Sequence, residues 1–175
     1  MMYIRDINDE YLKQLDKIIR HAKDAFASVT VNISDGSCIM ANSRIASLEL
    51  KDVNEPLDSY IERISQSIPQ REVRTQYRKV FCVDNLRECL TQRKDMIQWE
   101  CPVYAAKGIS LRMIRTTVEM IRNVSYDRLE ALIYFSDITE NYFSEQIPHM
   151  LYRKNFDRIE IIDGQRDCVR LDHPG

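Results

Sequence analysis

The sequence predicts an α+β domain built on a five-stranded antiparallel sheet with short helices on one face. Apolar and polar residues alternate over residues 26–33 and again from residue 96, which is the period of β-strands, and residues 129–136 are apolar on both faces, as a central strand is. Between these runs, over about residues 57–90, apolar residues recur at helical spacing. These helical stretches are apolar on one side only, so they need a sheet to pack against.

Composition and charge restrict the classes of function. The chain has 175 residues, of which 44% are hydrophobic and 30% charged, an ordinary composition for one domain with extensions. A formal net charge of -2 gives no general electrostatic reason to expect a nucleic-acid partner or an acidic membrane. No apolar run approaches the roughly 18 residues needed to cross a bilayer, and residues 1–10 are polar rather than signal-like. We therefore expect a cytoplasmic chain without nucleic-acid binding or direct membrane insertion.

The N-terminal segment, residues 1–24, is predicted to form a flanking helix. Asn8 or Asp9 could cap it, and residues 10–23 carry one apolar stripe. The stripe consists of Tyr11, Leu12, Leu15, Ile18, Ile19 and Ala22. The helix could fold back on the domain or pair with its copy in a second subunit, and both options stay open. A homodimer through the flanking helices or through the sheet face is the expected assembly.

A hairpin follows the flanking helix. The stretch from Phe26 to Ile33 alternates cleanly between apolar and polar residues, as a half-buried strand does. Residues 34–37 read Ser-Asp-Gly-Ser and predict a turn, and a second strand returns from Cys38 to Ala41.

Three short helices are predicted next. The first begins after Pro56, the second covers about residues 73–81, and the third begins behind a cap at Asp84 or Asn85. Pro69 separates the first two helices.

Three strands then complete the sheet. The first runs from Met96 to Val103, and the second covers residues 109–122. The apolar parity of the second strand changes near Met113 and Ile114, which predicts either a bulge there or a strand whose two halves bury different faces. The third strand, residues 129–136, is apolar on both faces, so we expect it to lie between neighbours rather than at an edge.

Beyond the last strand the pattern changes again. Residues 140–151 approximate helical spacing, with Pro148 as a kink or an interruption. Residues 156–171 repeat the strand-turn-strand pattern of the opening hairpin, as the start of a second unit or as a C-terminal hairpin on the same domain. The predicted organisation is a flanking helix at 1–24, a domain at 25–140, a linker helix at 141–155 and this last segment at 156–175.

The order of these elements and the ending Asp137-Ile138-Thr139-Glu140 resemble a PAS sensory domain. In many PAS domains an Asp-Ile-Thr sequence at the end of the last strand leads into the signalling helix. The resemblance covers about residues 26–140. It implies a non-catalytic sensory or regulatory module of a bacterial signalling protein, such as a GGDEF diguanylate cyclase or a sensor histidine kinase, with Asp137, Ile138 and Thr139 as the signal relay. It also implies an output domain that is absent from this chain.

The cofactors used by PAS domains can be compared with this sequence. A haem-binding PAS domain uses a histidine on its helical layer, whereas His21, His149 and His173 all lie outside the candidate core. A photosensory flavin domain places its reactive cysteine in a Gly-x-Asn-Cys-Arg-Phe-like stretch, which the surroundings of Cys82 and Cys89 do not match. Haem and photoactive flavin are both disfavoured, and the cofactor is left unknown.

The possibilities that remain for the ligand are a small apolar molecule or no ligand at all. A pocket, if present, is expected between the helices and the inner sheet face. The candidate lining residues are large aromatic and Met side chains of the predicted core, namely Phe81, Trp99, Met113 and Tyr134. Plain core packing is the alternative role for all four.

Two other classes of function are the alternatives to a sensory module. A ligand-free dimerisation or protein-interaction module would use the sheet face or the flanking helices. An enzyme would need Cys82 or Cys101 as a nucleophile, or Asp84 and Glu88 as acid and base. No histidine lies near either cysteine to activate it, and an Asp and a Glu at helical spacing usually mark a solvated face. The five cysteines contain no Cys-x-x-Cys pair, so a zinc site or a disulfide framework is not expected.

Overall fold

The structure is a computed structural model that describes residues 22–43, 45, 48–52, 54–105, 110–123, 128–145, 159–161 and 169–171. The chain divides into two compact units, Met1–Ile138 and Thr139–Gly175, and each is considered by itself. Within the described residues, no helix is long and apolar enough to span a membrane. The predicted N-terminal flanking helix falls almost entirely outside the described residues, as does Pro148.

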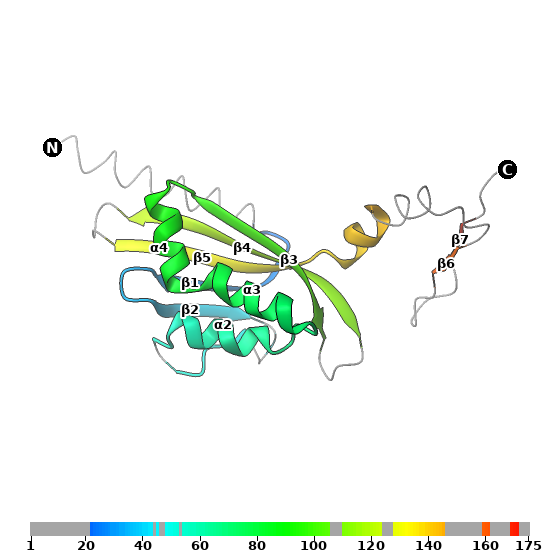
Figure 1. Ribbon diagram of the computed structural model, residues 1–175, viewed down its shortest axis with the longest axis horizontal. Helices are drawn as coiled ribbons and strands as arrows, with labels where there is room; N and C mark the ends of the chain where they lie inside the picture. The colour runs from blue at the N-terminus through cyan, green and yellow to red at the C-terminus, as the bar shows by residue number, and fades with distance from the viewer. Residues whose placement is uncertain are drawn as a thin grey trace. The chain divides into compact units, whose positions relative to one another are not determined.

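The first unit contains a five-stranded antiparallel sheet (Figure 1). Its strands are β1 (Ala25–Asn32), β2 (Ser37–Ser43), β3 (Met96–Tyr104), β4 (Leu111–Asn123) and β5 (Arg128–Asp137). They are arranged in the order β2-β1-β5-β4-β3, so the last strand pairs with β1 on one side and with β4 on the other. The prediction of a central last strand is confirmed, because β5 has a hydrogen-bonded neighbour at each of its edges.

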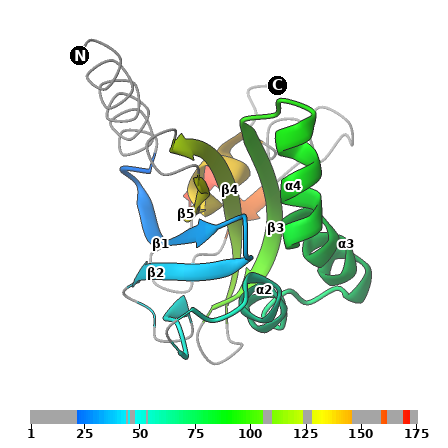
Figure 2. The same ribbon diagram turned by 90° about the vertical axis from the view of Figure 1, so that its left-hand side faces the viewer.

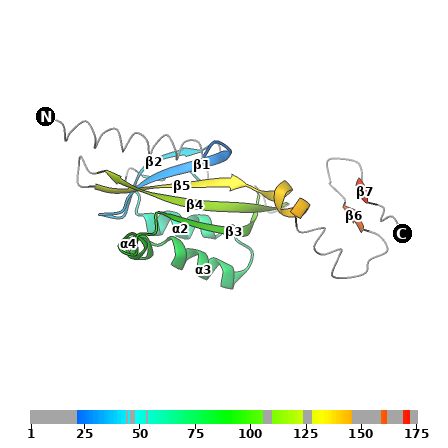
Figure 3. The same ribbon diagram turned by 90° about the horizontal axis from the view of Figure 1, so that it is seen from above.

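Three helices, α2 (Leu57–Ser65), α3 (Arg71–Phe81) and α4 (Val83–Thr91), join β2 to β3. Figure 3 shows all three on one side of the sheet, which we call the inner face. Figures 1 and 2 both show α2 beside β2. The predicted fold class, an antiparallel sheet with short helices on one face, is therefore confirmed.

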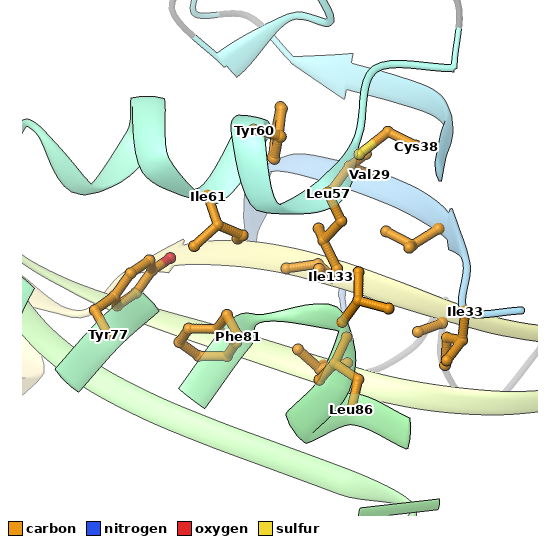
Figure 4. Packing of buried hydrophobic residues seen from close by; sticks show 14 of the residues in the cluster. Val29, Ile33, Cys38, Leu57, Tyr60, Ile61, Tyr77, Phe81, Leu86 and Ile133 are labelled. Carbon is orange, nitrogen blue, oxygen red and sulfur yellow. The ribbon is translucent and has the colours of Figure 1, made fainter. Parts of the chain in front are cut away.

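The core lies between the helices and the inner face. Val29, Val31 and Ile133 from the sheet are fully buried against Leu57, Tyr60, Ile61, Tyr77, Phe81 and Leu86 from the helices. Figure 4 shows Tyr77 and Phe81 projecting from α3 toward Ile61. The alternation in the strands and the helical spacing between them predict that these residues lie on the two surfaces that face each other.

The start of α4 differs from the prediction. The helix begins after Cys82, and neither Asp84 nor Asn85 caps it. Instead the Asp58 carboxylate, from α2, accepts a hydrogen bond from the backbone N–H of Val83 at 3.0 Å. A local pattern predicted the wrong cap because the acceptor comes from another helix, 25 residues earlier in the chain.

Of the two alternatives for β4, the structure excludes the bulge. The register of β4 with β3 and with β5 runs through Met113 and Ile114 without a shift. The apolar parity changes because Leu111 is 51% exposed, whereas Ile114, Thr116 and Val118 are buried on the inner face. The early apolar residues of this strand are thus not core residues.

Gly36 in the hairpin turn is required for two reasons. Its φ is +76°, a conformation that side chains with a Cβ rarely adopt. A Cβ at this position would also lie 3.0 Å from the side chain of Val83. The turn and the first residue of α4 can therefore pack closely only with glycine between them.

The second unit begins with helical residues 139–145, in agreement with the predicted helix after the last strand. Further on, β6 (Ile159–Ile161) pairs antiparallel with β7 (Val169–Leu171). The strand-turn-strand repeat predicted for residues 156–171 is compatible with this pairing. Whether it starts a second PAS-like unit stays a prediction.

Candidate functional site

A cavity of about 740 Å³ lies between the helices and the inner face of the sheet. This volume is within the range of pockets that hold small-molecule ligands. The apolar side chains that line it come from β1, β3, β4, β5, α2 and the loops that adjoin them: Phe26, Ile45, Leu48, Ile64, Ile68, Val103, Ala105, Ile114 and Phe135. The position of the cavity is the one that the sequence predicts for a pocket.

Strand registers bring the sheet residues of the cavity together. On β4, Arg112, Ile114 and Thr116 alternate on the inner face. The registers pair Cys101 with Ile114 and Thr116 with Phe135. Three neighbouring strands therefore contribute one continuous lining.

The floor of the cavity carries a buried pair of hydroxyls. The Tyr77 hydroxyl and Thr116 Oγ1 lie 3.0 Å apart, and both residues are 1% exposed. Burial raises the pKa of the Tyr77 hydroxyl above its ordinary value. Burial also raises the pKa of the Cys101 thiol to about 12. The floor is therefore electrically neutral at physiological pH.

Polar groups along the wall are already paired within the protein. Gln66 Nε2 donates to Glu62 Oε1 at 3.0 Å, and Ser67 Oγ donates to the Ile64 carbonyl at 2.7 Å. The backbone N–H of Tyr104 donates to the Ser67 carbonyl at 2.9 Å, which fixes the α2–α3 connection to the end of β3. A ligand would find few unsatisfied groups along this wall.

An ion pair stands at the mouth of the cavity. Arg112 Nη1 donates to Asp137 Oδ2 at 2.6 Å, and the two side chains are 57% and 30% exposed. Ion pairs with this much exposure typically contribute about 1 kcal/mol or less to stability. The Arg112–Asp137 contact joins the start of β4 to the last residue of β5. The backbone N–H of Ile138 then donates to the Met113 carbonyl at 2.9 Å.

A second ion pair lies outside the cavity lining. Glu55 and Arg63 are 7% and 19% exposed, with Arg63 Nη2 at 2.9 Å from Glu55 Oε2. The same carboxylate accepts from the backbone N–H of Lys51, and Arg63 also donates to the Glu49 carbonyl. The Tyr60 hydroxyl donates to the carbonyl of Leu48, a lining residue. We call this group, residues 48–52, 54 and 55 with Tyr60 and Arg63, the Glu55 corner.

None of the four residues that the sequence suggested as pocket lining lines this cavity. Phe81 is fully buried in the core beside Tyr77, with ring centroids 4.6 Å apart. Trp99 is on the inner face nearer the other end of β3, and its indole Nε1 is buried with no acceptor among the described residues. Met113 and Tyr134 have the parity of the outer face, where the Tyr134 hydroxyl donates to Glu119 Oε1 at 2.8 Å.

Asp137 is the predicted site residue that the cavity includes. Its partner Arg112, and the floor residues Tyr77 and Thr116, were not identified as site residues from the sequence, and Cys101 was considered only as a nucleophile. Tyr77 could have been considered, since it lies on the same helical stripe as Phe81. Nothing local to Arg112 indicates that it meets a carboxylate 25 residues later in the chain.

The candidate catalytic residues do not form a catalytic arrangement. A pKa of about 12 keeps the Cys101 thiol protonated and non-nucleophilic at neutral pH. Asp84 and Glu88 are exposed on α4. Of the two candidate nucleophiles, Cys101 lines the cavity and Cys82 does not. Among the described residues no group of three or more His, Cys, Asp or Glu side chains could hold a metal ion.

No protein-family model matches the chain, and no curated protein matches it. Among solved structures, it is similar to a sensory box histidine kinase/response regulator from Burkholderia thailandensis, at 16% identity and a TM-score of 0.46, over 78% of this chain and 95% of that one. It is similar to an RNA-binding light-oxygen-voltage receptor, at 11% identity and a TM-score of 0.45, over 74% of this chain and 36% of that one.

A light-oxygen-voltage domain from work with a flavin analogue is similar at 15% identity and a TM-score of 0.42, over 80% of this chain and 96% of that one. The description of the first unit as PAS-like rests on its own topology. The order of its elements along the chain, two strands, three helices and three strands, is the one on which the PAS resemblance of the sequence rests, and the five strands form one sheet.

Proposed function

We propose that the chain is a non-catalytic sensory or regulatory domain of the PAS type, in which a small, largely apolar molecule occupies the cavity. The observation that carries the proposal is the position of the cavity. Its volume is about 740 Å³, and Asp137, the last residue of the last strand, is one of its lining residues. A ligand there would contact both the core and the point at which the first unit ends.

The relay would act through the end of β5. Asp137 is held by Arg112, and Ile138 by the Met113 carbonyl, so the end of β5 is fixed to β4 immediately before residue 139. A ligand that binds one arrangement of this strand end better than another would shift the population toward it. The change would pass to the helical residues 139–145 through Asp137, Ile138 and Thr139. The output would be that of a signalling protein such as a diguanylate cyclase or a histidine kinase, in the cytoplasm.

Native mass spectrometry of protein purified from its own host tests the proposal. We expect a retained small molecule at one per chain, seen as a difference between the native and the denatured mass. A bare chain, obtained under conditions that preserve known PAS–ligand complexes, would contradict a ligand-binding function.

A cavity-filling variant tests whether the retained molecule occupies this site. Val103 is half-buried and lines the cavity, so Val103→Phe would fill part of the volume and abolish retention. Ile97→Phe is the matched control, because Ile97 is also half-buried on the inner face of β3 but does not line the cavity. Equal loss of the ligand in both variants would point to a general packing defect instead.

Replacing Asp137 by Ala tests the relay. The ion pair it removes is exposed, so the domain should remain folded while the output of the full-length signalling protein changes. An unfolded variant would make Asp137 a structural residue. A folded variant with unchanged output would remove it from the relay.

A dimerisation module is the second candidate. The specific observation in its favour is the edge strand β2, where Ile39 and Met40 are 43% and 62% exposed. Exposed apolar residues on a sheet edge can pair with a second chain. The native mass reports the number of subunits, and a bare dimer would favour this candidate over the sensor. Substituting Met40→Lys should then yield a monomer.

A further inference from the structure

The polar side chains that line the cavity differ in whether their hydrogen-bond donors are already used within the protein. Gln66 and Ser67 are paired within the protein, and the hydroxyls of Tyr77 and Thr116 bond to each other. Arg112 is the one cationic side chain among the described residues that line the cavity. Its guanidinium uses Nη1 for Asp137, while Nε and Nη2 have no acceptor among the described residues. The strongest available donors therefore stand at the mouth.

The geometry of the guanidinium favours an anion over a cation at this point. A guanidinium presents its donors in a planar fork that can hold two carboxylates, or hold one carboxylate through two parallel bonds. A ligand carboxylate could therefore add to Arg112 beside Asp137, or replace Asp137. A cationic head group would have to compete with Arg112 for a carboxylate that is already engaged.

The rest of the lining determines the other end of the ligand. Behind Arg112 the same inner-face row continues with Ile114, and Phe135 and Ile68 also line the cavity. These apolar side chains favour contact with the hydrocarbon part of a ligand, and none of them carries a charge. The lining thus has a single cationic end and an apolar interior.

We propose that the cavity binds an amphipathic monocarboxylate, with its hydrocarbon part against the apolar lining and its carboxylate on Arg112. The proposal rests on the proposed sensory function and gives the chemical class of its ligand. It also gives the relay a mechanism, because a carboxylate on Arg112 competes with Asp137 for the same guanidinium. Ligand binding would then loosen the contact that fixes the end of β5 to β4.

Calorimetric titration of the ligand-free full chain with decanoate and decanol tests the proposal. The two probes share a hydrocarbon chain and differ in the head group. We expect decanoate to bind roughly tenfold more tightly, as two charge-assisted hydrogen bonds at a solvated site allow. The preference for decanoate should shrink as salt is raised, while decanol binding should not weaken.

Three variants locate the effect. Arg112→Gln should remove the preference for decanoate and leave decanol binding unchanged. Arg115→Gln is the matched control: Arg115 lies on the same strand with the parity of the outer face, is 42% exposed, and pairs with Glu100 at 2.7 Å. It should change neither affinity. Asp137→Asn removes the competing carboxylate and should tighten decanoate binding severalfold.

The outcomes separate this proposal from the proposed function. Equal affinity for decanoate and decanol, or a preference that survives Arg112→Gln, would overturn the carboxylate assignment while leaving a ligand-binding cavity. Tighter binding of decylamine would overturn it in favour of a cationic ligand at Asp137. If neither decanoate nor decanol binds, the ligand class is wrong. The native mass of the protein from its host then decides independently whether any ligand is bound.

Discussion

The two ion pairs beside the cavity have opposite surroundings. Glu55 and Arg63 are 7% and 19% exposed and make further hydrogen bonds to the backbone of residues 49 and 51. The Arg112 and Asp137 side chains are 57% and 30% exposed, and the Arg112 side chain makes one hydrogen bond among the described residues. The Glu55–Arg63 ion pair is therefore a structural contact, whereas the more exposed Arg112–Asp137 pair is the one that we propose exchanges with a ligand.

The largest effect is expected from Glu55→Ala. The substitution would leave the mostly buried Arg63 without its carboxylate and the Lys51 N–H without its acceptor, which should lower the free energy of unfolding by about 3 kcal/mol. Urea denaturation measures the change. A loss comparable to that of an exposed pair would show that burial does not distinguish the two ion pairs.

Alkaline pH should lower the free energy of unfolding through buried thiols, and not through the exposed ion pair at the mouth. Burial raises the pKa of Cys38, which packs near Glu55, from 9.0 to about 12, and raises the pKa of Cys101 equally. The folded state keeps these protons after the unfolded state has lost them. The contribution of these two thiols to the free energy of unfolding should therefore be fully present below about pH 9 and be lost as the pH rises toward about 12.

Burial and the hydrogen bond with Glu119 raise the pKa of Tyr134 to about 12 and act in the same direction. Urea midpoints measured at several pH values test the effect. The variant with Cys38→Ala and Cys101→Ala should show a shallower decline. An unchanged decline would mean that the two thiols are not responsible.

Tyr60→Phe should have an intermediate effect. It removes a neutral hydrogen bond to the Leu48 carbonyl in the Glu55 corner and keeps the aromatic ring in the core, at an expected cost of about 1 kcal/mol. Because Leu48 lines the cavity, the variant should also alter the affinity for a ligand. A change in stability without any change in affinity would separate the corner from the site.

The smallest change in stability is expected from Arg112→Gln. Loss of an ion pair this exposed should cost less than about 1 kcal/mol, close to the effect of Arg115→Gln on the opposite face. Thermal denaturation of the two variants side by side provides the measurement. A cost for Arg112→Gln near that of Glu55→Ala would make the mouth a structural element and would weaken the exchange mechanism.

Local patterns determined the secondary structure and much of the architecture. Alternation identified β1 and β3, helical stripes identified α2 and α3, and the two apolar faces of residues 129–136 identified β5 as a central strand. These features are predictable because burial on one face imposes a period of 2 on a strand and of about 3.6 on a helix. The position of Asp137 at the end of β5 was also evident from the sequence.

Tertiary structure alone decided which side chains form the site. Tyr77 and Phe81 belong to one helical stripe, yet Tyr77 lines the cavity and Phe81 fills the core. The partner of Asp137 is Arg112, and the cap of α4 is Asp58, each 25 residues away in the chain. Periodicity reports which face a residue occupies, but contacts across a sheet or between helices depend on strand register and helix placement, which no local pattern encodes.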